Sequence, residues 1–135
     1  MHTTNYQATF IEVADDCPTD HAVEPPAKDE PTIAQLHYAL IAEQPYALTS
    51  DDVVFETHAR RAGIAEGDKE AARVAFFSKG QPCLRSSPLG KRYGWGIHHD
   101  ADGRVALVPR ESAEYGRLAS DDGTAHTRAM RSRRA

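Results

Sequence analysis

Alternating apolar and polar positions mark two parts of the chain as β-structure. Residues 6–13 alternate in this way and are rich in aromatic and β-branched side chains, which predicts a strand. Residues 93–109 hold two further apolar runs around the turn sequence 100–103. This arrangement predicts a β-hairpin whose three-residue loop closes with Gly103 in the left-handed conformation. The expected register pairs Ile97 with Leu107 and His99 with Val105, so that the core face consists of Trp95, Ile97, Val105 and Leu107.

The opposite face of this hairpin carries Gly94, Gly96 and His98, so two of its three positions have no side chain. A bare strip on a strand either allows a helix to pack closely or allows a ligand to reach the backbone. The sequence leaves both interpretations open.

Between the two β-regions, apolar residues recur every three or four positions, which predicts three helices. The first follows a capping box at residues 32–35 and ends before Pro45. The second begins with Ser50 as its N-cap and ends at Gly63, and the third covers about residues 68–78. These helices are expected to bury His37 and His58 on their apolar faces.

The remaining segments are predicted to be less regular. Residues 15–31 are rich in acids and prolines and are expected to form an exposed loop. A short helix is expected around residues 112–119, and the basic tail at 128–135 is interpreted as a solvated end or as a functional arm.

Strands at the two ends of the chain, with helices between them, predict an α+β fold in a single domain of residues 1–135. The expected architecture is a small antiparallel sheet, made of the N-terminal strand and the C-terminal hairpin. About three helices from residues 32–78 are expected to cover one face of that sheet.

Charge is distributed unevenly along the chain. The formal net charge of −4 combines −9 over residues 1–67 with +5 over residues 68–135. Two interpretations follow: the acidic and basic halves face each other, or a basic face meets an anionic partner.

The sequence also restricts compartment and chemistry. It has no apolar run long enough to span a membrane and no signal peptide, so we expect a cytoplasmic protein without a membrane partner. Cys17 and Cys83 are the only cysteines and are expected to be free thiols. His98 and His99 point to opposite faces of a strand, so no metal site is predicted, and we expect no cofactor.

The most promising candidate site is the segment 78–92. It combines hydroxyl groups, Gly80 and four basic side chains with no acid, which is the chemistry that binds phosphate or another anion. The spacing from Gly80 to Gly90 is too long for a P-loop. The alternatives are a solvated basic loop and a nucleic-acid surface on which Tyr93 and Trp95 stack with bases. The predicted ligand-binding residues are Lys79, Arg85, Ser86, Ser87, Lys91, Arg92 and Trp95.

Cys83 is a second candidate, as a nucleophile. Lys79 and Arg85 would favour its thiolate if they surround it in space, and His98, His58 or His99 would act as the base. The alternative is a cysteine that is simply buried beside its apolar neighbours.

Six segments of the chain carry a resemblance to known sequences: residues 1–6 (MHTTNY), 10–14 (FIEVA), 46–52 (YALTSDD), 76–89 (FFSKGQPCLRSSPL), 91–98 (KRYGWGIH) and 129–133 (AMRSR). Through these segments the chain resembles a family of small uncharacterised bacterial proteins. That resemblance implies a bacterial cytosolic domain and carries no activity, cofactor or catalytic residue with it.

Three functional hypotheses follow. The first is a non-catalytic module that binds an anionic small molecule or nucleic acid through segment 78–92. The second is a small enzyme that uses Cys83 with a histidine base. The third is an interaction protein whose acidic and basic halves make a homo-oligomeric contact.

Overall fold

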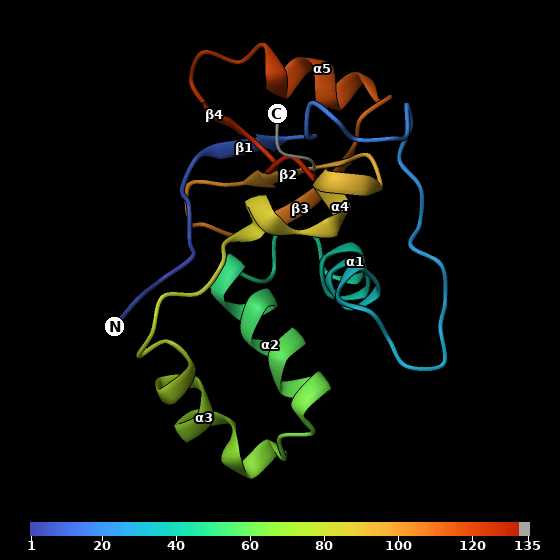
Figure 1. Ribbon diagram of the computed structural model, residues 1–135. Helices are drawn as coiled ribbons and strands as arrows, with labels where there is room; N and C mark the ends of the chain where they lie inside the picture. Colours follow the sequence, from blue (N-terminus) through green and yellow to red (C-terminus); the bar gives the residue numbers. More distant parts are fainter. Residues whose placement is uncertain (133–135) are drawn as a thin grey trace.

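A four-stranded mixed sheet organises the structure, a computed structural model that describes residues 1–132. The strands lie in the order β3-β2-β1-β4 (Figure 1). Strand β2 is antiparallel to both β1 and β3, whereas β4 pairs in parallel with β1. The strands are β1 (Thr9–Glu12), β2 (Trp95–His99), β3 (Val105–Pro109) and β4 (Ala125–Arg128).

The predicted hairpin is confirmed in its register and in its turn. Ile97 pairs with Leu107, and His99 pairs with Val105. Gly103 has a φ of 81° and donates its N–H to the carbonyl oxygen of Asp100 at 3.0 Å. Glycine adopts this left-handed conformation at little cost, which is why it closes the loop.

Strand β4 is the part of the sheet that the sequence did not predict. Its four side chains are exposed or half-exposed, so no apolar pattern marks it. Backbone hydrogen bonds hold it instead, from Ala125 N–H to Ala8 and from Ala129 N–H to Glu12. The start of the predicted basic tail therefore belongs to the sheet, while Arg133 and Arg134 lie outside the described residues.

Five α-helices and two short 3₁₀ turns make up the helical part of the described residues. Both η2 and α4 fall within segment 78–92, where a loop was expected. The helices are α1 (Ile33–Glu43), α2 (Ser50–Ala62), α3 (Lys69–Phe76), α4 (Pro88–Arg92) and α5 (Ala113–Ala119), and the 3₁₀ turns are η1 (Glu66–Asp68) and η2 (Leu84–Ser86).

The N-termini of α1 and α2 are both closed by capping boxes. The predicted box of Thr32 and Gln35 is confirmed for α1. For α2 the predicted N-cap, Ser50, is wrong, because Thr49 caps the helix and exchanges hydrogen bonds with Asp52 at 3.2 and 3.0 Å. Thr49 and Asp52 have the spacing of a reciprocal box, and this leaves Ser50 buried in the first turn.

Helices cover both faces of the sheet (Figure 1). Helices α1, α2 and α4 lie on one side, where Ile11, Leu40 and Ile97 belong to the largest core cluster. Helix α5 covers the other side, through a cluster of Phe10, Val108 and Leu118. Helices α1 and α2, from the predicted helical region 32–78, thus cover one face as expected, and the short helix predicted around residues 112–119 covers the other.

Helix α5 also decides between the two interpretations of the bare strip on β2. A Cβ atom added to Gly96 would lie 2.7 Å from the ring of Phe10 and 2.9 Å from the ring of Tyr115. The absent side chain thus makes room for two aromatic rings, which is the close-packing alternative.

The N-terminal residues run along the start of α2. Asp51 accepts hydrogen bonds from the hydroxyl groups of Thr3 and Thr4 and from the backbone N–H of Thr4, over 2.6–2.8 Å. The side-chain oxygen of Asn5 also accepts a hydrogen bond from the backbone N–H of Asp51 at 2.9 Å. The segments 1–6 and 46–52 are thereby joined.

Helix α3 lies farthest from the sheet and packs against α2 (Figure 1). Phe55, Ala59 and Phe77 form a separate cluster between these elements. The helical part of the molecule therefore extends away from the sheet, and the surfaces between α1, α2 and segment 81–93 are left open to solvent.

Candidate functional site

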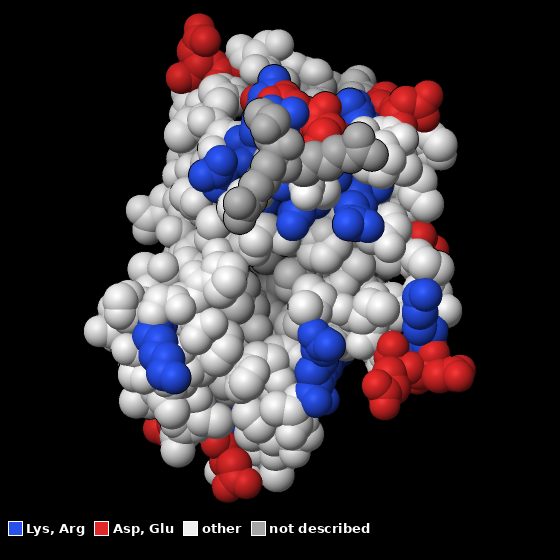
Figure 2. Space-filling view, viewed as in Figure 1, with Lys and Arg blue, Asp and Glu red and all other residues white. Residues whose placement is uncertain are grey.

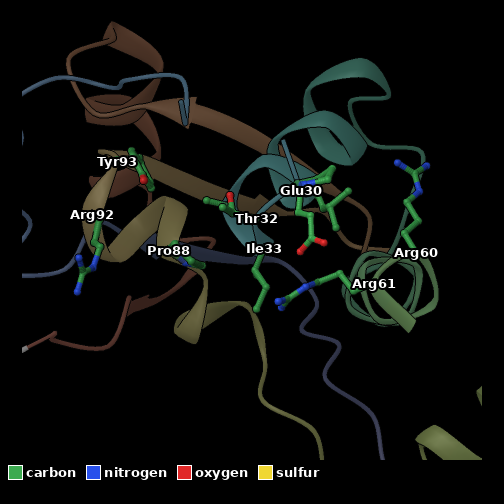
Figure 3. Close-up of a pocket in the computed structure, with 11 residues that line it drawn as sticks. Glu30, Thr32, Ile33, Arg60, Arg61, Pro88, Arg92 and Tyr93 are labelled. Carbon is green, nitrogen blue, oxygen red and sulfur yellow. The ribbon is translucent and has the colours of Figure 1, made fainter. Parts of the chain in front are cut away.

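Two adjoining cavities lie between α1, the C-terminal part of α2 and segment 81–93. The larger is a groove of about 880 Å³, drawn in Figure 3. Polar and apolar side chains contribute to it, and Glu30 is its one acid among the described residues. The groove is lined by Glu30, Pro31, Thr32, Ile33, Ala34, Leu36, Arg60, Arg61, Pro88, Arg92 and Tyr93.

The smaller cavity has a volume of about 320 Å³. It shares Ile33, Arg61 and Pro88 with the groove, so the two are contiguous. No acid lines it among the described residues. Its lining consists of Ile33, His37, Val54, Thr57, His58, Arg61, Phe76, Gln81, Pro82, Cys83, Ser86 and Pro88.

Arg61 is the cation that the two cavities have in common. It lies in the last turn of α2, where the partial negative charge of a helix C-terminus favours a basic residue. Figure 3 shows its side chain directed toward the end of the groove that Ile33 and Glu30 line, whereas Arg60 points away and Arg92 lies at the opposite end. Arg61 is exposed, and it forms no salt bridge with any acid among the described residues.

His37 contributes a neutral imidazole to the smaller cavity. Only 7% of the residue is exposed, and its Nδ1 is 2.8 Å from the hydroxyl oxygen of Ser87. Burial lowers the pKa of His37 to about 4, so the ring carries no charge at neutral pH. Because Nδ1 is already engaged, Nε2 is the ring nitrogen that remains for a ligand.

Cys83 is half-buried in the same cavity. Its Sγ lies 3.2 Å from the hydroxyl oxygen of Tyr6. Burial, and next the contact with Cys83, raise the pKa of Tyr6 to about 12. The phenol therefore stays protonated at neutral pH and can donate its hydrogen to the sulfur.

Comparison with known proteins gives a family and no function. One protein-family model, described as a family of unknown function (DUF6157), matches residues 1–135. The chain belongs to this family. No curated protein and no solved structure matches the DUF6157 chain.

Only part of the predicted ligand set lines these cavities in the DUF6157 chain. Ser86 and Arg92 do so, together with Cys83. Lys79 and Lys91 lie outside both linings. Figure 2 shows that basic side chains nevertheless gather on the surface around α4.

Three predicted ligand residues have structural contacts instead. Ser87 is buried, caps α4 and contacts His37. Arg85 donates its Nε–H to the backbone oxygen of Arg128 at 2.7 Å, which ties η2 to the end of β4. Trp95 donates its indole N–H to the carbonyl oxygen of Val23 at 2.9 Å and thereby fastens the acidic loop.

The suggested pair of Cys83 and His98 is not brought together. His98 points to the α5 side of β2, next to Phe10, and its Nδ1 lies 2.9 Å from the hydroxyl oxygen of Tyr46. The histidines that line the cavity of Cys83 are His37 and His58. Strand alternation explains the separation, because His98 faces the opposite side from Ile97 and the core that Cys83 adjoins.

Sequence reasoning missed Arg61, His37 and Tyr6 as site residues. A signal for Arg61 existed, namely two consecutive arginines in the last turn of a predicted helix. Nothing local links Tyr6 to Cys83, since the two residues come together only when β1 takes its place in the sheet.

Two kinds of feature are absent from the described residues. Within residues 1–132, no group of three or more His, Cys, Asp or Glu side chains is arranged to hold a metal ion. Among the same residues, no helix has both the length and the apolar character needed to cross a bilayer.

Proposed function

We propose that this protein is a non-catalytic module that binds a small organic anion, bearing carboxylate or phosphate, in the groove between α1, α2 and α4. The observation that carries the proposal is Arg61, an exposed arginine that lines both cavities and whose guanidinium is directed toward the end of the groove that Ile33 and Glu30 line. A guanidinium group forms two parallel hydrogen bonds with a carboxylate or phosphate, which gives both affinity and orientation.

The surroundings of Arg61 support an anion with an uncharged body. Tyr93 adds a side-chain hydroxyl group to the groove, and Arg92 adds a second cation at its far end. The smaller cavity holds Val54 and Phe76 and no acid among the described residues, so it suits the less polar part of a ligand. Each of the two volumes falls in the size range of small-molecule sites.

Glu30 sets the balance of charge in the groove. As an acid facing the same space as Arg61, it opposes the entry of an anion. We therefore expect Glu30→Gln to strengthen anion binding by about two- to threefold, which isothermal titration calorimetry measures.

The central experiment compares Arg61→Ala with Lys79→Ala. Both variants remove one exposed positive charge, but only Arg61 lines the groove. A panel of small phosphates and carboxylates is first screened by thermal melts, and the best ligand is then titrated by calorimetry. Loss of a charged hydrogen bond costs about 1.5–3 kcal/mol, so Arg61→Ala should weaken binding about tenfold or more, and Lys79→Ala should leave it unchanged.

The result that contradicts the proposal is equal weakening in both variants. Together with a steep loss of affinity in salt and a preference for DNA or RNA over small anions, it would indicate a nucleic-acid surface. A panel without any binding anion would also refute the proposal.

A further inference from the structure

Opposite charges meet at one end of the groove. The carboxylate of Glu30 and the guanidinium of Arg61 are both directed into the space beside Ile33 (Figure 3). Both residues are exposed, and within residues 1–132 neither forms a salt bridge, with the other or with any further residue. This end of the groove therefore offers a ligand one negative and one positive group.

Glu30 is the part of the groove that the binding of a simple anion leaves unused. It is the only acid among the described residues that line the two cavities, and its charge repels a carboxylate or a phosphate. A ligand that carries a cation beside its anion turns this repulsion into attraction. An ammonium group bound by Glu30 and a carboxylate bound by Arg61 would satisfy both side chains at once.

The space next to these charges is apolar. Ile33 lines both cavities and is 39% exposed, although its side chain is large and carries no polar atom. Val54 and Phe76 line the smaller cavity, in which no acid is found among the described residues. A ligand that passes Ile33 therefore enters surroundings that favour the burial of an apolar group.

We infer that the ligand of the groove is a free α-amino acid with an apolar side chain. Arg61 binds its α-carboxylate, Glu30 binds its α-ammonium group, and its side chain enters the smaller cavity. The three groups of such a ligand branch from one carbon atom, which suits a site where two opposite charges and an apolar cavity meet at Ile33. The inference rests on the proposed function, because the α-carboxylate is the anionic group that the groove has to bind.

Other classes of ligand use fewer of these groups. A simple carboxylate is opposed by Glu30, and a simple amine is opposed by Arg61. A nucleic acid brings phosphates but no cation for Glu30, and its affinity falls steeply as salt is added. The α-amino acid is the class in which every charge at this end of the groove has a partner.

The test compares three ligands that share a phenyl ring. L-phenylalanine has both charged groups, 3-phenylpropanoate lacks the ammonium group, and 2-phenylethylamine lacks the carboxylate. Titrations of the full chain are followed by NMR, with the methyl resonances of Ile33 as the reporter of the groove. We expect L-phenylalanine to bind about threefold more tightly than either analogue. L-leucine and 4-methylpentanoate form a second pair with a smaller side chain.

Glu30→Gln gives the sharpest result, because the inference predicts opposite signs for two ligands. The variant should weaken the binding of L-phenylalanine by about three- to fivefold and strengthen the binding of 3-phenylpropanoate by about two- to threefold. A general loss of structure cannot produce both effects. Asp29→Asn is the matched control, since it removes an exposed acid next in the chain that lines neither cavity, and it should change neither affinity.

Arg61→Ala tests the carboxylate end of the ligand. It should weaken both L-phenylalanine and 3-phenylpropanoate by about tenfold, because each loses a charged hydrogen bond, and it should not weaken 2-phenylethylamine. Lys79→Ala, which removes a positive charge outside both cavities, should leave all three affinities unchanged.

The outcomes separate the two proposals. If 3-phenylpropanoate or another anion binds through Arg61, but the amino acids bind no more tightly than their analogues, anion binding stands and amino-acid recognition is overturned. Strengthening of both members of a pair by Glu30→Gln has the same meaning. If neither these ligands nor any anion of the wider panel binds, both proposals fail.

Discussion

Gly96 shows how a single missing side chain shapes the packing of α5. The rings of Phe10 and Tyr115 pack against β2 at the Cα of Gly96. The two rings also contact each other, with their centroids 5.0 Å apart. The contact depends on the absence of a Cβ atom, not on an unusual backbone conformation. The residue is therefore sensitive to substitution although it is far from both cavities.

We expect Gly96→Ala to lower the free energy of unfolding by about 1–3 kcal/mol, because the added methyl group would lie within 3 Å of two aromatic rings. Chemical denaturation measures the change. Gly116→Ala in α5 is the matched control. Its Cβ would meet nothing within 4 Å, and alanine in a helix should stabilise the protein by about 0.5–1 kcal/mol. Equal effects of the two substitutions would contradict this packing.

Two buried histidines make stability depend on pH. Burial lowers the pKa of both His37 and His99 to about 4 in the folded protein, against 6.5 as the ordinary value. Between these values the unfolded chain binds protons that the folded chain does not. Stability from these groups is therefore complete above about pH 7 and falls as the pH drops from 6.5 toward 4.

Each histidine should cost about 2 kcal/mol of stability between pH 7 and pH 5. Denaturation with urea at the two pH values measures the loss. His99→Phe keeps a ring against Tyr6, which His99 contacts edge-on at 5.4 Å, and removes one titrating group. The variant should lose about 2 kcal/mol less than the original protein over this pH range. An identical loss in both proteins would contradict the assignment to His99.

At the scale of elements, the N-terminal segment behaves as a strap that is fixed to the first turn of α2. Asp51 accepts three hydrogen bonds from Thr3 and Thr4, and Thr4 is buried. We expect Asp51→Ala to reduce the free energy of unfolding by about 2 kcal/mol, since it leaves buried donors without an acceptor.

Asp122→Ala is the control for this strap, because it removes an exposed acid from the loop before β4. Its effect should stay below about 0.5 kcal/mol. Thermal melts of the two variants compare their stabilities. Similar midpoints would show that the hydrogen bonds of Asp51 contribute little to the free energy of unfolding.

Elements with a clear period or a cap were predictable, and short elements without either were not. The helices at 33–43 and 50–62 follow from apolar spacing and N-cap chemistry, and the hairpin follows from its turn. Helix α4 has five residues and β4 has four, too few to establish a period. Each depends on tertiary contacts: Gly90 of α4 accepts a hydrogen bond from the N–H of Ala14, and Ala125 of β4 donates its N–H to Ala8.

The candidate site was harder to predict than the fold. The side-chain chemistry of segment 78–92 predicted a binding site there. Two of the predicted ligand residues, Ser86 and Arg92, line the cavities in the structure. That chemistry could not show that Arg85 and Ser87 are engaged by Arg128 and His37, because those partners lie more than forty positions away in the sequence. The contribution of Arg61 likewise requires the packing of α2 against α1.

For the whole molecule, the uneven charge of the sequence is partly internal. Arg73 pairs with Asp52 at 2.9 Å, and Arg128 lies 3.3 Å from Asp15, so bases of the second half meet acids of the first. Among residues 1–132, the arginines of the groove form no such pair. The first interpretation of the charge pattern therefore applies in part, and the second, a basic face that meets an anionic partner, stays a prediction.

The central position of β1 predicts slow folding. Its neighbours in the sheet come from residues 95–99 and 125–128, so native pairing has to close long loops. We expect refolding on the millisecond to second scale. Stopped-flow fluorescence of Trp95, the single tryptophan, follows it, because its indole binds Val23 only in the folded state. Complete refolding within microseconds would contradict this expectation.

The same placement of β1 has a consequence for synthesis on the ribosome. Of the four strands, β1 is translated first, but its two neighbours in the sheet come from residues 95–99 and 125–128. Until those residues have been synthesised, the apolar side chains of Phe10 and Ile11 have no sheet to enter. The nascent chain therefore carries an unpaired strand through most of the synthesis of residues 1–128, and the sheet closes only late in that synthesis.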